Sequence, residues 1–200
     1  MHTYKIQKIQ TSDFDQLMSL YISCFKNDSY IKAMFPGDTT RVNKMKREFE
    51  GNIKYCIEND GAYGIFENDE LIAFILFFDY KKIKQTDYDK FEKIFKGENK
   101  TFPLLYEEEI HTKIDNIDGS VIYLLSMGVS EKYRNKGIAS SLIDFMQERF
   151  PNDYLVGDVS NPSSMKIYEE RKNKRNFETE KIDEDYYFVK YQPNSASEDD

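Results

Sequence analysis

The 200-residue chain contains no tryptophan, only two cysteines and two histidines, and no apolar run close to the roughly 20 residues of a membrane-spanning helix. Cys24 and Cys56 lie on the apolar faces of expected helices, which favours buried thiols over a disulfide. So few histidines and cysteines predict no metal site. The opening segment, MHTYKIQKIQ, lacks the apolar core of a secretory signal, so the expected location is a reducing cytoplasm, with no membrane partner.

An excess of basic residues is missing as well. The chain has 28 lysines and arginines against 36 aspartates and glutamates, which gives a net charge of −8. A nucleic-acid-binding protein presents a basic face, so no nucleic-acid partner is expected. The acidic balance is compatible with a cationic substrate such as an amine. The 15 tyrosines and 15 phenylalanines provide core volume and candidate pocket walls.

The two common nucleotide-binding loops, GxxxxGK(S/T) and GxGxxG, are also absent. The chain is organised instead around a stretch in which the apolar run 121–129 predicts a buried strand, residues 130–136 a polar turn, and Gly137 the start of an amphipathic helix. The first N–H groups of a helix have no acceptor within it and the helix dipole is positive there, so this turn is expected to bind phosphate. Arg134 and Lys136 add positive charge.

The rest of the sequence predicts a single domain over residues 1–191 and an acidic, disordered tail over 192–200. Apolar patterning places further strands at 4–9, 62–66, 71–78, 154–159, 177–182 and 186–191, and helices beginning near residues 12, 42 and 161. No internal repeat and no second domain are visible.

Two segments break the regular pattern. Residues 26–38 are expected to be irregular, since they end in the turn Pro36-Gly37. The charged connection 80–120 contains two candidate short helices, 87–96 and 107–114. A connection of this length is either a functional lid or a decorated edge of the domain.

Residues 134–139, RNKGIA, match the pattern (Q/R)-x-x-G-x-(G/A), and Asn161, Ser164 and Tyr168 match N-x-x-(A/S)-x-x-x-Y. With the order of strands and helices, these motifs make the chain similar to the GCN5-related N-acetyltransferase (GNAT) family over nearly its whole length. The resemblance implies a mixed α/β (α+β) fold. Its mostly antiparallel sheet of about seven strands splays between strands 4 and 5 and is flanked by about four helices.

The resemblance also implies acetyl-CoA as co-substrate. In that family the pantetheine arm enters the wedge between the splayed strands and pairs with main-chain groups of strand 4, and the pyrophosphate lies on the following turn. Mapped onto this sequence, the implied cofactor-binding residues are Met127, Val129, Arg134, Asn135, Lys136, Gly137, Ile138, Ala139 and Asn161. The Arg134 side chain either points at the pyrophosphate or only supports the loop.

Catalytic roles follow from the same resemblance. Tyr168 lies seven residues after Asn161, two helical turns on, so both occupy one helix face. Its phenol would protonate the leaving thiolate, and the alternative is a tyrosine that packs under the wedge. Asp158, near the end of strand 5, is the candidate general base unless it binds a loop backbone, and Ser126 is a candidate to hold a water.

One departure from the family pattern follows Tyr168. The expected glycine that ends the helix is missing, and Asn173 or Asn176 is left to adopt the left-handed conformation. The inserted run is basic, and it either meets the 3′-phosphate of CoA or forms a solvated loop. Its basic residues are Arg171, Lys172, Lys174 and Arg175.

The resemblance implies an enzyme that transfers an acetyl group to an amine of a small molecule or peptide by direct attack in a ternary complex. Its acceptor site would be walled by residues 26–38, 80–120 and 183–187, and the candidate lining residues are Asp28, Tyr30 and Phe35. The alternative is a non-catalytic acyl-CoA-binding module for sensing or protein interaction. An unrelated phosphate-binding protein is disfavoured. The acceptor, the acyl chain and the oligomeric state stay open, a homodimer included.

Overall fold

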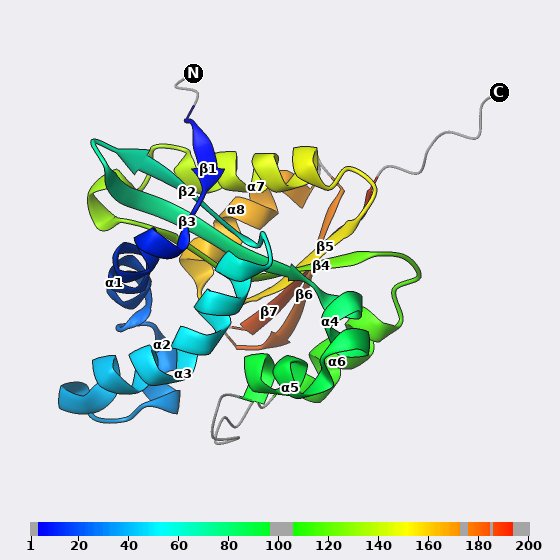
Figure 1. Ribbon diagram of the computed structural model, residues 1–200. Helices are drawn as coiled ribbons and strands as arrows, with labels where there is room; N and C mark the ends of the chain where they lie inside the picture. Colours follow the sequence, from blue (N-terminus) through cyan, green and yellow to red (C-terminus); the bar gives the residue numbers. More distant parts are fainter. Residues whose placement is uncertain (1–3, 97–105, 173–175, 185, 194–200) are drawn as a thin grey trace.

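In the computed structural model, which describes residues 4–96, 106–172, 176–184 and 186–193, seven strands form one sheet in the order β1-β2-β3-β4-β5-β7-β6 (Figure 1). The strands are β1 (Ile6–Lys8), β2 (Ala62–Glu67), β3 (Glu70–Asp79), β4 (Val121–Val129), β5 (Tyr154–Val159), β6 (Phe177–Asp183) and β7 (Tyr186–Tyr191). Neighbouring strands are antiparallel except β4 and β5, which are parallel. The expected fold class is therefore confirmed.

The described residues form eight α-helices and two short 3-10 turns. The helices are α1 (Phe14–Phe25), α2 (Ser29–Met34), α3 (Asp38–Glu58), α4 (Tyr80–Thr86), α5 (Tyr88–Lys96), α6 (Glu107–Asp115), α7 (Ile138–Arg149) and α8 (Pro162–Lys172); the 3-10 turns are Thr11–Asp13 and Glu131–Tyr133. The four longest, α1, α3, α7 and α8, are the flanking helices expected from the sequence. The other four are short additions around the sheet.

Two of the short helices contradict the sequence-based expectations. The segment 26–38 is not irregular throughout, because Asp28 accepts a hydrogen bond from Tyr30 N (2.9 Å) and so caps α2. In the connection 80–120, α4 begins directly after β3, where Asp79 accepts from Lys82 N (2.9 Å). The two helices expected there are present as α5 and α6.

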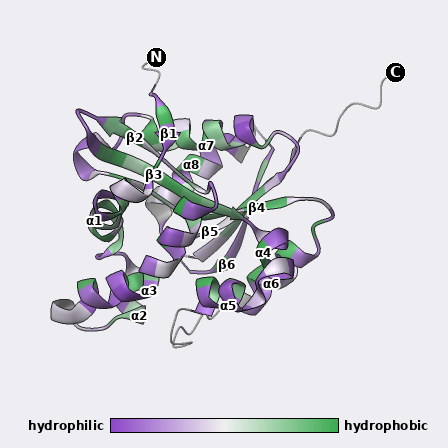
Figure 2. Cartoon of the chain, in the orientation of Figure 1, coloured by the Kyte–Doolittle hydropathy of each residue, from purple (hydrophilic) through white to green (hydrophobic). Residues whose placement is uncertain are grey.

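The helices form a layer on each face of the sheet (Figure 1). α7 and α8 pack on one face, and α1, α3 and the α4–α6 group lie on the other. Side chains of β4 alternate between these layers: Ile122 and Leu124 pack in the α7–α8 core, while Val121 and Tyr123 pack against α4–α6. Figure 2 shows the hydrophobic strands between helices whose outer faces are hydrophilic. The side-chain period of β4 thus divides the core in two.

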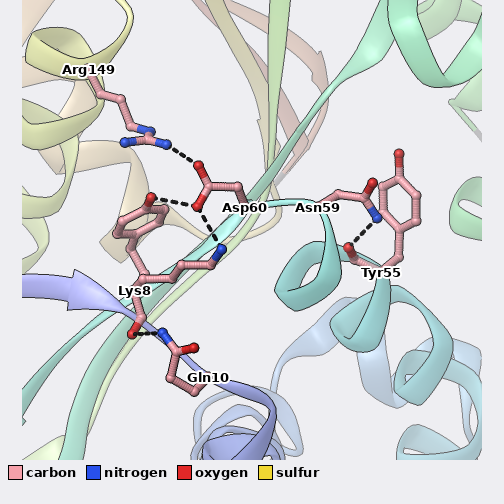
Figure 3. A network of polar contacts seen from close by, with 7 residues as sticks. Lys8, Gln10, Tyr55, Asn59, Asp60 and Arg149 are labelled. Carbon is pink, nitrogen blue, oxygen red and sulfur yellow. Dashed lines mark hydrogen bonds and ion pairs between the residues drawn. The ribbon is translucent and has the colours of Figure 1, made fainter.

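A polar cluster fixes the amino-terminal edge of the sheet. Figure 3 shows Lys8 and Arg149 converging on the carboxylate of Asp60, in the turn between α3 and β2. The Lys8 Nζ–Asp60 Oδ1 distance is 3.1 Å, and the Tyr63 hydroxyl donates to the same oxygen at 2.9 Å. One carboxylate therefore ties β1, β2 and the end of α7 together.

The sheet opens between β4 and β5. Their parallel pairing covers only residues 121–124 of β4 and 154–157 of β5. Where it stops, β4 carries a bulge: Leu76 of β3 pairs with Ser126 and the next residue, Phe77, pairs with Leu124, so Leu125 is skipped. A bulge bends its strand and increases the local twist. The second half of β4 therefore diverges from β5, and the expected wedge is present.

Within the described ranges, no helix is both long and apolar enough to cross a membrane. Most of the tail expected to be disordered, residues 194–200, lies outside the described residues, as do Asn173, Lys174 and Arg175.

Candidate active site

Two adjoining cavities occupy the wedge. The outer cavity, of about 720 Å³, is bounded by the second half of β4, the turn before α7, the first residues of α7, and α8. The inner cavity, of about 190 Å³, lies deeper, among β4, β5, α1–α3 and α5–α6. Both are lined by Phe25, Asp28, Met127, Asn161 and Ser164. The two cavities therefore adjoin each other across these five residues.

The edge of β4 that faces the wedge carries main-chain groups without a neighbouring strand. Ser130 N donates to Ile72 O of β3 (2.8 Å), so alternate residues of β4 direct their main-chain groups toward β3. Those of Met127 and Val129 consequently point away from β3 and into the wedge, beyond the last residue paired with β5. This placement agrees with the strand-like pairing expected for a ligand.

Arg134 supports the end of that strand. Its Nε donates to Val129 O (3.2 Å), and the Cys24 thiol lies 3.6 Å from the same oxygen. Burial raises the pKa of the Cys24 thiol, while the nearby Arg134 charge lowers it. Arg134 also lines the outer cavity, so its side chain braces the strand while its charge faces the site.

The turn before α7 presents its backbone to the outer cavity. Asn135 and Gly137 have φ values of 60° and 77°, the left-handed region, and Gly137 is the N-cap of α7 with no side-chain cap. A Cβ built on Gly137 would meet nothing within 4 Å, so the space in front of the helix is open. Free N–H groups at a helix start attract anions. This geometry fits a phosphate group.

The other residues of this motif have different positions. Asn135, Ile138 and Ala139 line the outer cavity, although the Ile138 side chain is buried in the core. The Lys136 ammonium lies 4.9 Å from the centroid of the Tyr133 ring and its side chain is not among those lining the cavity. Lys136 therefore contributes long-range charge in this conformation.

Helix α8 brings Asn161 and Tyr168 to the wedge. Asn161 Oδ1 accepts from Ser164 N (2.8 Å) and so begins the helix, while its side chain lies between the two cavities. Tyr168 lines the inner cavity and packs edge-on against Phe177, with ring centroids 5.6 Å apart. Burial raises the pKa of the Tyr168 hydroxyl, and the charge of Arg171 lowers it to a smaller extent. Tyr168 thus keeps its proton at neutral pH.

Arg171 has neither of the roles considered for it from the sequence. It is buried, and it donates to Asp144 Oδ1 (2.8 Å) and Ser140 O (2.9 Å) of α7. It therefore fastens α8 to α7 rather than meeting CoA or solvent. Asn176 takes the left-handed conformation (φ 54°) before β6, as one of the two candidates for that position.

Asp158 is a partly buried acid that lines the inner cavity. The hydroxyls of Tyr123 and Tyr186 donate one hydrogen bond to each carboxylate oxygen, the latter at 2.7 Å. Burial raises the pKa of Asp158, and the two hydrogen bonds partly offset that rise. The Asp158 carboxylate is therefore held by these two hydroxyls, and not by a loop backbone as in the alternative considered from the sequence. Neither tyrosine was singled out from the sequence. The position of Tyr123 inside the apolar run of β4 was the one signal that could have indicated a buried hydroxyl in need of a partner.

A second carboxylate lies where the cavities meet. Asp28 caps α2, and Ser160 Oγ lies 3.4 Å from Asp28 Oδ1. Burial raises the pKa of Asp28, and hydrogen bonds from α2 main-chain groups, Ser160 and Asn161 lower it. Two acids therefore face one small cavity.

Of the remaining candidate residues, two line the inner cavity and one does not. Ser126 lines the inner cavity, where it hydrogen-bonds the buried hydroxyl of Tyr21. Tyr30 lines the same cavity, but Phe35 packs in the core against Phe49, with ring centroids 6.3 Å apart, and lines neither cavity. No group of three or more histidine, cysteine, aspartate or glutamate side chains among the described residues is arranged to hold a metal.

Comparison with known proteins follows this geometry. No curated protein matches the chain. Among solved structures, it resembles a histone acetyltransferase HPA2-related acetyltransferase from Corynebacterium glutamicum (12% identity, TM-score 0.63, covering 98% of this chain and 99% of that one). It also resembles the mosquito arylalkylamine N-acetyltransferase like 5b, at 9% identity and a TM-score of 0.64, over 94% of this chain and 98% of that one. A third similar structure is the PaiA N-acetyltransferase from Thermoplasma acidophilum in complex with coenzyme A, at 15% identity and a TM-score of 0.56, over 96% of this chain and 99% of that one. A model of the acetyltransferase (GNAT) family matches residues 14–172. The chain belongs to the GNAT family of acetyltransferases.

Proposed function

We propose that this protein is an N-acetyltransferase that moves the acetyl group of acetyl-CoA to an amine by direct attack in a ternary complex. The observation that carries the proposal is that two adjoining cavities at the wedge share lining residues. The outer one offers an anion site and a strand edge that is not paired with β5, and the inner one offers two carboxylates and a protonated tyrosine. The solved relatives named for amine acetylation and for bound coenzyme A support the same activity.

The residues of the outer cavity fit coenzyme A. The open helix start at Gly137 and the charge of Arg134 suit a pyrophosphate, together with Asn135, Ile138 and Ala139 of the same turn, while Lys136 adds charge from outside the cavity lining. Main-chain groups of Met127 and Val129 suit the amides of a pantetheine arm, and the Asn161 amide lies at the point where that arm would pass into the inner cavity. Acetyl-CoA supplies an activated acetyl thioester, whose cleavage releases a thiolate.

Two side chains of the inner cavity handle the protons. Asp158 accepts a proton from the acceptor ammonium, because burial raises its pKa toward the range useful for a base. The neutral amine then forms the C–N bond as the C–S bond breaks. Tyr168 gives its proton to the thiolate sulfur and is reprotonated afterwards. The second proton that the nitrogen loses on becoming an amide restores the Tyr168 phenol, and the proton held by Asp158 passes to solvent. The step then balances as ammonium plus thioester giving amide, thiol and one proton.

The test uses Tyr168→Phe, with free-thiol release measured over a panel of amines and CoA affinity measured by calorimetry. We expect kcat to fall by about 100-fold while the Kd for CoA is unchanged. Tyr191→Phe is the matched control, because Tyr191 packs against the same Phe177 ring but lines neither cavity. Full turnover by Tyr168→Phe would remove the assigned acid. CoA binding without turnover of any amine would instead support the non-catalytic acyl-CoA module.

A further inference from the structure

The inner cavity is acidic at one end. Ser160, two residues after Asp158, places its Oγ 3.4 Å from Asp28 Oδ1, and all three residues line the cavity, so both carboxylates lie at this end. Asp28 also lines the outer cavity, which places this end next to the site proposed for the thioester. An ammonium group would find its charge partners here, beside the reacting carbonyl.

The other end of the inner cavity is apolar. Its walls come from α2, α3, α5 and α6, and their apolar lining residues are Ile31, Met34, Phe49, Ile94, Phe95 and Ile110. Asn52 is the polar residue of this wall, and its Nδ2 is already bonded to Ile94 O (3.2 Å). Among the described residues that line the cavity there is no lysine, arginine or histidine. Within this described lining, a negative charge on the acceptor would therefore find no cationic partner.

Aromatic rings line the cavity beside Asp158. The ring of Tyr186 stacks on that of Tyr106, with centroids 4.9 Å apart. The centroid of the Tyr186 ring also lies 6.0 Å from that of the Tyr30 ring. Tyr30 and Tyr186 line the cavity. Aromatic faces attract cations and pack well against other rings. This arrangement suits a ring attached to an ammonium by a short chain.

The size of the cavity limits the acceptor. A cavity of about 150 Å³ lined by aliphatic and aromatic side chains is enough to hold a benzene ring. The inner cavity is about 190 Å³ and must also admit the reacting end of the thioester. This volume matches one ring and a short linker.

We infer that the acceptor is a compact primary amine with a single positive charge, a ring-sized apolar group and no carboxylate. The inference rests on the proposed N-acetyltransferase function. Amino acids are disfavoured because their carboxylate would be buried without a partner. Polyamines are disfavoured because a second ammonium would lie in the apolar end. Peptides are disfavoured by the small volume.

Phe95 is the residue that sets the length of the acceptor. It lines the cavity from α5 and its ring lies 5.1 Å from the ring of Tyr123, the partner of Asp158. The bond from Asn52 to Ile94 O and that from Lys90 Nζ to Gly51 O (3.0 Å) fasten α5 to α3. The apolar wall is therefore held in place before any ligand enters.

The experiment compares phenethylamine, phenylalanine, spermidine and a lysine-containing peptide, by thiol release and by direct binding calorimetry with CoA present. We expect kcat/KM for phenethylamine to exceed that for phenylalanine, which differs by one carboxylate, by at least about 100-fold. Spermidine and the peptide should be poorer still. Preference for either of these would overturn the inference while leaving acetyl transfer intact.

Two variants locate the specificity. Phe95→Ala should raise kcat/KM for 4-phenylbutylamine relative to phenethylamine by about 10-fold, because the lost ring makes room for two more methylenes. Phe91→Ala is the matched control, since Phe91 is a buried ring on the same helix that does not line the cavity. An equal shift in both variants, or none in Phe95→Ala, would overturn the assignment of the wall.

The binding measurement separates this inference from the proposed function. If phenethylamine binds in competition with longer amines but no thiol is released, the acceptor class stands and the acetyl transfer fails. If phenethylamine neither binds nor reacts while CoA binds, the acceptor class is wrong.

Discussion

Tyr186, on β7, donates a 2.7 Å hydrogen bond to Asp158, on the neighbouring strand β5, inside the inner cavity. A hydrogen bond to a carboxylate stabilises its charged form, so this bond lowers the pKa of Asp158 against the rise caused by burial. The pair therefore sets the pH at which the proposed base becomes available.

Tyr186→Phe should move the acidic limb of the kcat/KM profile to higher pH. Without the hydroxyl, the Asp158 carboxylate loses a donor, its pKa rises, and a larger fraction is protonated at a given acidic pH. The measurement is a pH–rate profile with a saturating thioester. Tyr187→Phe is the control, because Tyr187 packs in the α7–α8 core. An acidic limb at the wild-type position would exclude Asp158 as the base.

Asp158→Asn should abolish turnover and change how stability depends on pH. Because burial raises the pKa of Asp158 in the folded state, the folded protein holds that proton more tightly than the unfolded chain does. Its contribution to stability is therefore present below the unfolded pKa and is lost as pH rises through the folded pKa.

The unfolding free energy of Asp158→Asn minus that of the wild type should accordingly increase as the pH rises from the ordinary carboxyl pKa, about 4, through the raised pKa of the folded state. Urea denaturation at several pH values measures it. Asp118→Asn, at an exposed position, should show a much smaller dependence. A difference that decreases with pH would have the wrong sign for a carboxyl whose pKa burial has raised.

Gly137→Ala should weaken CoA binding by about 10-fold or more, because a methyl group would enter the open space at the helix start. The left-handed backbone at this position should also cost about 1 kcal/mol of stability. Gly119→Ala provides the control, since Gly119 also has a positive φ (125°) but lies before β4, outside both cavities. Equal losses of CoA affinity in the two variants would refute the phosphate site.

Arg171→Met should lower the unfolding free energy by about 2–3 kcal/mol, because it removes the ion pair from Arg171 to Asp144 and the hydrogen bond to Ser140 O that join α8 to α7. Lys132→Met breaks the exposed pair with Glu70 and should leave the denaturation midpoint unchanged. A wild-type midpoint for the Arg171 variant would show that other contacts hold α8.

The strands around the wedge were predictable because their signal is local. The apolar runs of β4, β5 and β7 give the observed bounds without adjustment. The short helix α2 was missed because one cap, the bond from Tyr30 N to Asp28, decides it, and a single cap is a weak signal in a polar segment.

The side-chain partners could not be predicted in the same way. Arg171 appeared to belong to a solvated basic run, but Asp144 lies 27 residues earlier and only the packing of α8 on α7 brings the two together. The link from Tyr123 to Asp158 spans 35 residues and depends on the parallel register of β4 and β5. Motifs predict the proposed cofactor region, whereas the proposed acceptor region depends on such distant pairs.

The bulge at Leu125 has a consequence for the energetics of binding. Since β4 turns away there, it cannot continue its hydrogen-bonded ladder with β5, and the slot is present before either ligand arrives. Neither ligand then has to break strand pairing in order to enter. The conformational entropy of holding the slot open is lost during folding, so binding proceeds to a preorganised site.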